Sequence, residues 1–173
     1  FLQDFIRNKD RFSFPQKIGE GITLHRAIDT FTDAHPEIHE AKKIFSPLVR
    51  LYAGAFVDVS FDYFLANSIG DKALKAHSEK VYRVLRNHEE LLPPNLLRML
   101  DSMEKDNWLY NYRADWGIEF SMKNVLNKAK YLNKNLAVFE VFLNNKPRLQ
   151  YHFDHFFPDL VAEVQKIDSG FRS

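Results

Sequence analysis

The sequence predicts an all-α protein that folds as a single-domain helical bundle. Apolar residues recur at helical intervals along most of the 173 residues, and no segment shows the strict alternation that marks a strand. We find no internal repeat and no low-complexity tract. The chain is 45% hydrophobic and contains 16 Phe, enough to bury one sizeable core, so we expect one domain over residues 1–173.

The composition narrows the class of protein. The 24 Lys and Arg against 23 Asp and Glu give a net charge of +1, which argues against a nucleic-acid partner bound through bulk charge. No run approaches the roughly 18 consecutive apolar residues that span a bilayer, so we expect no membrane association. With no Cys, any metal must be held by nitrogen and oxygen ligands, and the composition fits a reducing cytoplasm.

The segment 19–37 predicts a helix that carries a candidate metal-binding edge. His25 and Asp29 are four residues apart, so a helix stacks them on one face. Leu24 and Ile28 repeat the same interval on the neighbouring stripe. We therefore expect the His/Asp edge to face the protein interior.

The segment 51–66 predicts a second helix, apolar on nearly every side and therefore buried. Its carboxylates are Asp58 and Asp62, whose like charges at i and i+4 repel and whose removal from water costs several kcal/mol. A cation should offset that cost. Arg26 could contribute, but a divalent metal accounts more simply for acid and imidazole groups on two buried helices. Asp4, set among apolar residues, is a further buried-carboxylate candidate.

The rest of the chain reads as helical scaffold. Thr32 or Asp33 is placed to cap the helix that starts at Pro36. Further helices are expected over 71–90, 94–106, 116–132, 136–143 and 147–171. We expect His77 and His88 on the apolar side of the first of these, opposite a basic stripe that is either solvated or a docking surface for an acidic partner: Lys72, Lys75, Lys80, Arg83 and Arg86.

The acid and imidazole side chains are the remaining candidates for catalysis, because the sequence lacks the common catalytic motifs. There is no Gly-rich phosphate loop, no G-x-S-x-G elbow and no His-Glu-x-x-His. Hard oxygen ligands with one imidazole suit Mn²⁺ or Mg²⁺, which can polarise a phosphoryl oxygen and lower the pKa of a bound water. Phosphoester hydrolysis follows, with Arg26 as a clamp for phosphate oxygens. The alternative is that each pair is a cap or a hydrogen-bonded polar group of the core.

Two blocks of sequence carry a family resemblance. They are Gly21-Ile22-x-x-His25-Arg26-x-Ile28-Asp29-x-Phe31-Thr32-Asp33-x-x-Pro36 and Asp58-Val59-x-x-Asp62-x-Phe64-Leu65. Shorter matches extend the likeness over nearly the whole chain: Asp4-Phe5, Tyr112-Arg113, Asn124-Val125-Leu126-Asn127 and Phe157-Pro158. Together these residues resemble the acyl carrier protein phosphodiesterase family, also called holo-acyl-carrier-protein hydrolases.

The resemblance implies an all-helical fold distantly related to the HD-domain phosphohydrolases. It implies Mn²⁺-dependent removal of the phosphopantetheine arm from the serine of holo-acyl carrier protein, with functional positions at Asp4, His25, Arg26, Asp29, Asp58 and Asp62. We assign Asp4, His25, Asp29 and Asp58 to the metal, and Asp62, Arg26 and Asp29 to catalysis. Tyr63 stands where some members have a His, so it is not expected to be a ligand.

The chain opens at Phe1 without a Met, and we expect an upstream segment, in which the family carries a histidine. Because acyl carrier proteins are acidic, the basic stripe, or Arg26 with Lys42 and Lys43, is a candidate docking face. Two other functions stay open: an HD-type phosphohydrolase that acts on a nucleotide or another small phosphodiester, and a non-catalytic helical interaction module.

Overall fold

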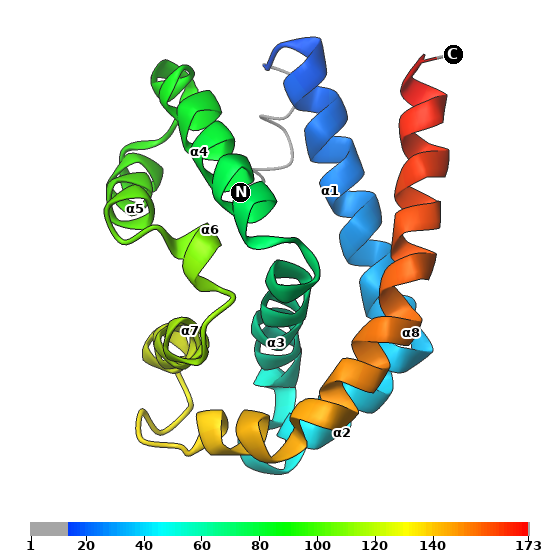
Figure 1. Cartoon of the computed structure of the whole chain (residues 1–173), viewed down its shortest axis with the longest axis vertical. Coiled ribbons are helices and arrows are strands. Elements are labelled where there is room, and N and C mark those ends of the chain that lie inside the picture. Colours follow the sequence, from blue (N-terminus) through cyan, green and yellow to red (C-terminus); the bar gives the residue numbers. More distant parts are fainter. Residues whose placement is uncertain (1–13, 173) are drawn as a thin grey trace.

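The computed structural model describes residues 14–172, and every regular element in this range is helical (Figure 1), which confirms the all-α prediction. Besides α-helices there are two short 3₁₀ turns, η3 and η4. In chain order the elements are α1 Gln16–Ala34, α2 Pro36–Val49, η3 Arg50–Tyr52, α3 Ala53–Ser68, α4 Asp71–Arg86, η4 Glu89–Leu91, α5 Pro94–Lys105, α6 Trp108–Asn111, α7 Asp115–Lys128 and α8 Val138–Arg172.

Helix α3 lies at the centre of the fold, with α1 and α8 on one side and the α4–α7 half on the other (Figure 1). It packs against α2, α7 and α8. Aromatic side chains fill these contacts: the ring centroids of Phe45 and Phe56 lie 5.8 Å apart, and those of Phe61 and Phe153 lie 5.4 Å apart. The predicted burial of this helix is confirmed, because most of its apolar residues belong to the main core.

The long helical run Pro36–Ser68 has the length and composition of a membrane span, but these properties alone are weak evidence for one. The run is interrupted at Arg50, whose φ of 50° ends α2 before the turn η3 begins. Its buried side chains make up much of the core. The hydropathy of this run is therefore explained by packing inside the fold.

The cap of α2 differs from the prediction. His35 is the N-cap residue, and its Nδ1 accepts a hydrogen bond from the backbone N–H of Glu37 at 3.2 Å. Thr32 and Asp33 cannot serve, because α1 continues through Ala34 and keeps both residues in helical conformation. The prediction that one of them caps α2 was wrong.

Two predictions about later helices were also wrong. His77 and His88 are exposed rather than on the apolar side, and His88 lies beyond the end of α4, where its Nδ1 is 2.9 Å from the carbonyl oxygen of Val84. The two predicted C-terminal helices form the single helix α8, which continues through Pro147 and Pro158. Since α8 packs along α1, α2, α3 and α7, tertiary contacts hold it together despite the hydrogen bonds that proline cannot make.

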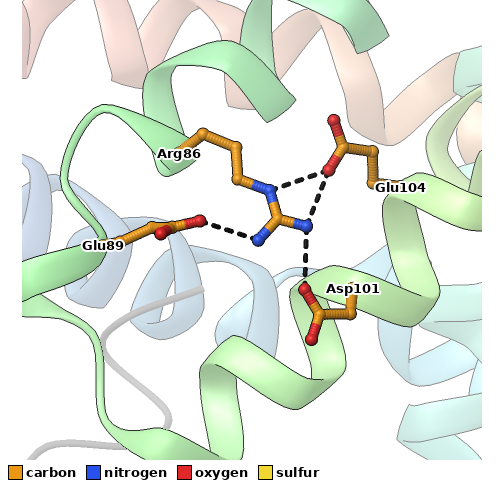
Figure 2. A network of polar contacts seen from close by, with 4 residues as sticks. All are labelled: Arg86, Glu89, Asp101 and Glu104. Carbon is orange, nitrogen blue, oxygen red and sulfur yellow. Dashed lines mark hydrogen bonds and ion pairs between the residues drawn. The ribbon is translucent and has the colours of Figure 1, made fainter.

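Arg86 ties the end of α4 to the two elements that follow it (Figure 2). Its guanidinium donates to Glu89 at 2.7 Å, to Asp101 at 2.8 Å and to Glu104 at 2.7 Å. Planar guanidinium groups suit such multiple carboxylate contacts. One member of the predicted basic stripe is therefore saturated by acids of the same protein and fixes α5 against α4.

Helices α6 and α7 approach each other closely at Gly117. A β-carbon placed on Gly117 would overlap the backbone carbonyl oxygen of Asn111. Backbone atoms cannot move aside as a flexible side chain can, so only glycine allows this contact. The contact sets the position of the aromatic residues on α6 and at the start of α7.

We expect Gly117→Ala to lower the free energy of unfolding by about 2 kcal/mol or more, because the added methyl group forces α6 and α7 apart. Urea unfolding followed by circular dichroism measures it. The matched control is Gly21→Ala, since Gly21 is an exposed helical glycine with open space around its position among the described residues. That control should gain about 0.5–1 kcal/mol. Equal effects at the two positions would contradict the close contact.

Candidate functional site

His25 and Asp29 form the predicted pair on α1. His25 Nδ1 lies 3.0 Å from Asp29 Oδ2, as expected for residues one helical turn apart. The side chains are 35% and 57% exposed, so the prediction that this edge faces the interior was wrong for Asp29. The reason is that α1 packs along α8 and α2 and buries only Ile22 fully, which leaves its His/Asp edge in contact with solvent.

Asp58 and Asp62 form the second predicted pair, on the core helix α3. Burial, together with the smaller effect of the charge of Asp58, raises the pKa of Asp62 to about 7. Although part of the Asp58 side chain is exposed, the surrounding protein removes enough water from its carboxylate to raise its pKa to about 6. The raised pKa values of both carboxyl groups therefore reflect the predicted cost of placing two carboxylates on an apolar helix.

The acids of α1 and α3 act on one another. The charges of Asp33 and Asp29 help to raise the pKa of Asp58, while the charge of Lys42 on α2 opposes them. Lys42 Nζ also lies 3.0 Å from Asp33 Oδ1. Lys42 thus supplies part of the positive charge that the sequence predicts near Asp58. From the sequence alone, Lys42 is only a candidate docking residue.

The two pairs lie close enough for the charge of Asp29 to act on Asp58, but the described residues do not form a complete set of metal ligands. Within residues 14–172, no three His, Asp or Glu side chains are grouped closely enough to hold a metal ion. The predicted ligand Asp4 lies outside the described residues. The donors that are present, carboxylate oxygens with one imidazole, fit Mn²⁺ or Mg²⁺. The raised carboxyl pKa values come mainly from burial, which the charge of Lys42 offsets only in part at Asp58.

Arg26 and Tyr63, two other residues discussed from the sequence, lie on α1 and α3. Arg26 follows His25 on α1 and is half-buried. Tyr63 points toward α8, where Lys146 Nζ donates to its hydroxyl at 3.1 Å and its ring lies 5.4 Å from that of Phe142. Tyr63 is therefore part of the packing between α3 and α8.

Tyr112, just after α6, was missed as a site residue. Burial raises its pKa to about 12, and the nearby charge of Asp62 adds to this effect, while a hydrogen bond with Ser121 opposes it. The only signal for it in the sequence was the Tyr112-Arg113 match noted above. The structure places this tyrosine near Asp62 of α3 and Ser121 of α7.

The described residues form an all-α fold in which one helix carries a His/Asp pair and the central helix carries two carboxylates. The chain belongs to the acyl carrier protein phosphodiesterase family, whose sequence model matches residues 1–160. It is 27% identical over 169 residues to an acyl carrier protein phosphodiesterase of Salmonella agona (strain SL483), covering 95% of this chain and 88% of the relative. It is 24% identical over 168 residues to that of Enterobacter sp. (strain 638), covering 95% and 87%. No solved structure matches the chain significantly.

We expect Asp62→Asn to stabilise the chelator-treated protein at pH 8 by an amount on the order of 2 kcal/mol, after allowance for partial solvent contact. The folded-state pKa of Asp62 is raised to about 7, so the penalty for ionising it is absent near pH 4, grows between pH 4 and pH 7 and is complete above pH 7. Thermal unfolding of both proteins across this pH range measures the difference. Glu90→Gln, at an exposed residue, is the control. An Asp62→Asn gain that did not change with pH would contradict the raised pKa.

Proposed function

We propose that this protein hydrolyses holo-acyl carrier protein to apo-acyl carrier protein and phosphopantetheine. The observation that carries the proposal is the family match over residues 1–160. The acid and imidazole groups of α1 and α3 support it, because phosphodiester hydrolysis needs a charged site that can activate water and stabilise a phosphoryl group. These groups lie on the two blocks through which the chain resembles the family.

We assign the metal ligands to His25 and Asp58, together with Asp4, and we assign Asp29 the role of orienting His25. The hydrogen bond between His25 Nδ1 and Asp29 fixes the imidazole and leaves Nε2 as the atom that can ligate. A bound Mn²⁺ or Mg²⁺ would polarise a phosphoryl oxygen and lower the pKa of a water molecule. A divalent cation would also offset the effect of burial that, together with the charges of Asp33 and Asp29, raises the carboxyl pKa of Asp58.

Asp62 and Arg26 take the remaining catalytic roles. A carboxyl group with a pKa of about 7 can hold or release a proton at neutral pH, which suits Asp62 to act as a general base. The guanidinium of Arg26, next to His25 in the sequence, would stabilise negative charge on the phosphoryl oxygens.

Helix α4 is the docking face that we propose for the acidic carrier protein. Lys72, Lys75 and Arg83 are exposed on it, and α4 begins three residues after the core helix α3 ends. The alternative face is weaker, because Lys42 pairs with Asp33 and Lys43 pairs with Glu40. Opposite charges across such an interface mainly increase the association rate.

Incubating the protein with holo-acyl carrier protein and Mn²⁺ should yield a carrier whose mass falls by that of phosphopantetheine less the one water molecule that hydrolysis consumes, as measured by mass spectrometry. We expect His25→Ala and Asp58→Asn each to lower kcat/KM at least about 100-fold, since each would remove a metal ligand. His155→Ala is the control, because His155 is an exposed histidine on α8 that bonds only to the Tyr151 carbonyl of its own helix among the contacts seen. An unchanged carrier mass would reject the substrate.

The same experiment separates the two other functions. If a nucleotide or another small phosphodiester were cleaved while the carrier stayed intact, the site would be that of a different phosphohydrolase. The interaction-module alternative predicts no hydrolysis of any substrate and no rise in the melting temperature on addition of Mn²⁺.

The double substitution Lys75→Glu with Arg83→Glu should raise KM for holo-acyl carrier protein about 10-fold or more at low salt and leave kcat nearly unchanged, because docking and not chemistry is affected. Steady-state kinetics at two ionic strengths test this, since the defect should shrink as salt rises. The double substitution Lys130→Glu with Lys166→Glu, at two exposed lysines outside α4, controls for the change in net charge. Equal KM values for the two variants would contradict docking on α4.

A further inference from the structure

The α6–α7 half contains two adjoining cavities, one of about 440 Å³ and one of about 520 Å³. Four residues line both of them: Trp108, Tyr112, Phe120 and Ser121. These volumes lie within the range of roughly 300–1,000 Å³ that small-molecule sites occupy. The two cavities meet at these four residues, and together we call them the aromatic pocket.

Four aromatic residues line the aromatic pocket, together with apolar and polar residues that include Asp106 and Lys128, and some of the aromatic rings are open to solvent. Trp116 is 58% exposed and Phe120 is 47% exposed, although large aromatic side chains are usually covered in a folded domain. The Trp108 and Phe120 rings meet edge to face with their centroids 6.3 Å apart. Ser121 and Asn124 add a hydroxyl and a carboxamide to the wall. An apolar pocket with a few polar groups is typical of a ligand site.

The aromatic pocket adjoins the candidate active site. Tyr112 lines both cavities, and the charge of Asp62 acts on its hydroxyl. Val59, the neighbour of Asp58 on α3, lines the second cavity. A linear molecule that reacts at the acid pairs could therefore extend past Tyr112 into the pocket.

We infer that the aromatic pocket binds the pantetheine arm of the substrate, an inference that rests on the proposed function. The arm is linear, is built largely of methylene and methyl groups, and carries two amides. Its apolar parts match the rings of Trp108, Trp116 and Phe120, and its amides match the polar groups of Ser121 and Asn124. Val59, which adjoins Asp58 on α3, and Tyr112, which lies near Asp62, both line the pocket, and this position favours the arm over a second protein chain, which would not need to reach the acid pair.

The two tryptophans provide a direct test, because the chain contains only Trp108 and Trp116 and both line the aromatic pocket. Titration with phosphopantetheine, and separately with pantetheine, should change the intrinsic fluorescence in a saturable way. Inorganic phosphate alone should leave it unchanged. Fluorescence that stays constant with both organic ligands would overturn the inference.

Substitution of Phe120 locates the binding. Phe120→Ala should weaken the binding of pantetheine at least about 10-fold and raise KM for holo-acyl carrier protein similarly, with a melting temperature near that of the unsubstituted protein, since Phe120 is partly exposed. Tyr131→Ala, at an aromatic residue that is 78% exposed and lies outside both cavities, should leave both quantities unchanged. Affinities equal to the unsubstituted protein in Phe120→Ala would reject the pocket.

The two proposals fail in different ways. If holo-acyl carrier protein is hydrolysed but Phe120→Ala changes neither KM nor pantetheine binding, the pocket assignment is wrong and the function stands. If pantetheine binds and Phe120→Ala abolishes the binding while the carrier is never hydrolysed, the proposed reaction is wrong and the pocket stands.

Discussion

The candidate site depends on the way the central helix α3 holds two carboxylates while the helix itself is fixed in the core. The phenylalanine side chains of α3 pack into the main core, and Asp58 and Asp62 lie one helical turn apart on the same helix. Asp62 is half-buried, whereas Asp58 reaches solvent. The surrounding protein removes water from both carboxylates and thereby raises their pKa values. Raised carboxyl pKa values of this kind are common at functional sites.

The sequence predicted those features that depend on spacing within one helix. The i and i+4 pairs on α1 and α3, and the burial of α3, follow from local periodicity alone. It could not predict how far α1 lies from the centre of the core, because that depends on the packing of α8 along α1. For this reason Asp29 is more exposed than expected. The continuity of α8 through Pro147 and Pro158 escaped prediction for the same reason, since distant contacts outweighed a local helix breaker.

Residues that matter through distant contacts were the hardest to find. Lys42 belongs to an amphipathic helix and looks like an ordinary surface lysine, yet its charge acts on Asp58 and its Nζ bonds Asp33. Tyr112 follows a helix of four residues, and its link to Asp62 appears only once α6 and α7 are folded against α3. Neither residue shares a helical face with the acids, so no periodic pattern could have connected them.

The α4–α7 half has a small hydrophobic cluster of its own, formed by Tyr82, Leu100 and Met103. Its position also depends on specific polar and steric contacts. Arg86 holds α5 against α4 through three carboxylates, and the hydroxyl of Tyr82 on α4 accepts a hydrogen bond from the backbone N–H of Leu109 on α6 at 3.1 Å. Gly117 then sets the spacing between α6 and α7. This half provides both the exposed lysines of α4 and the aromatic pocket. The contacts of Arg86, Tyr82 and Gly117 would therefore fix the position of a carrier docked on α4 relative to the pocket and the acid pairs. A carrier bound to α4 would deliver its arm along the same half of the molecule that holds the pocket, so docking, arm binding and hydrolysis would share one rigid frame.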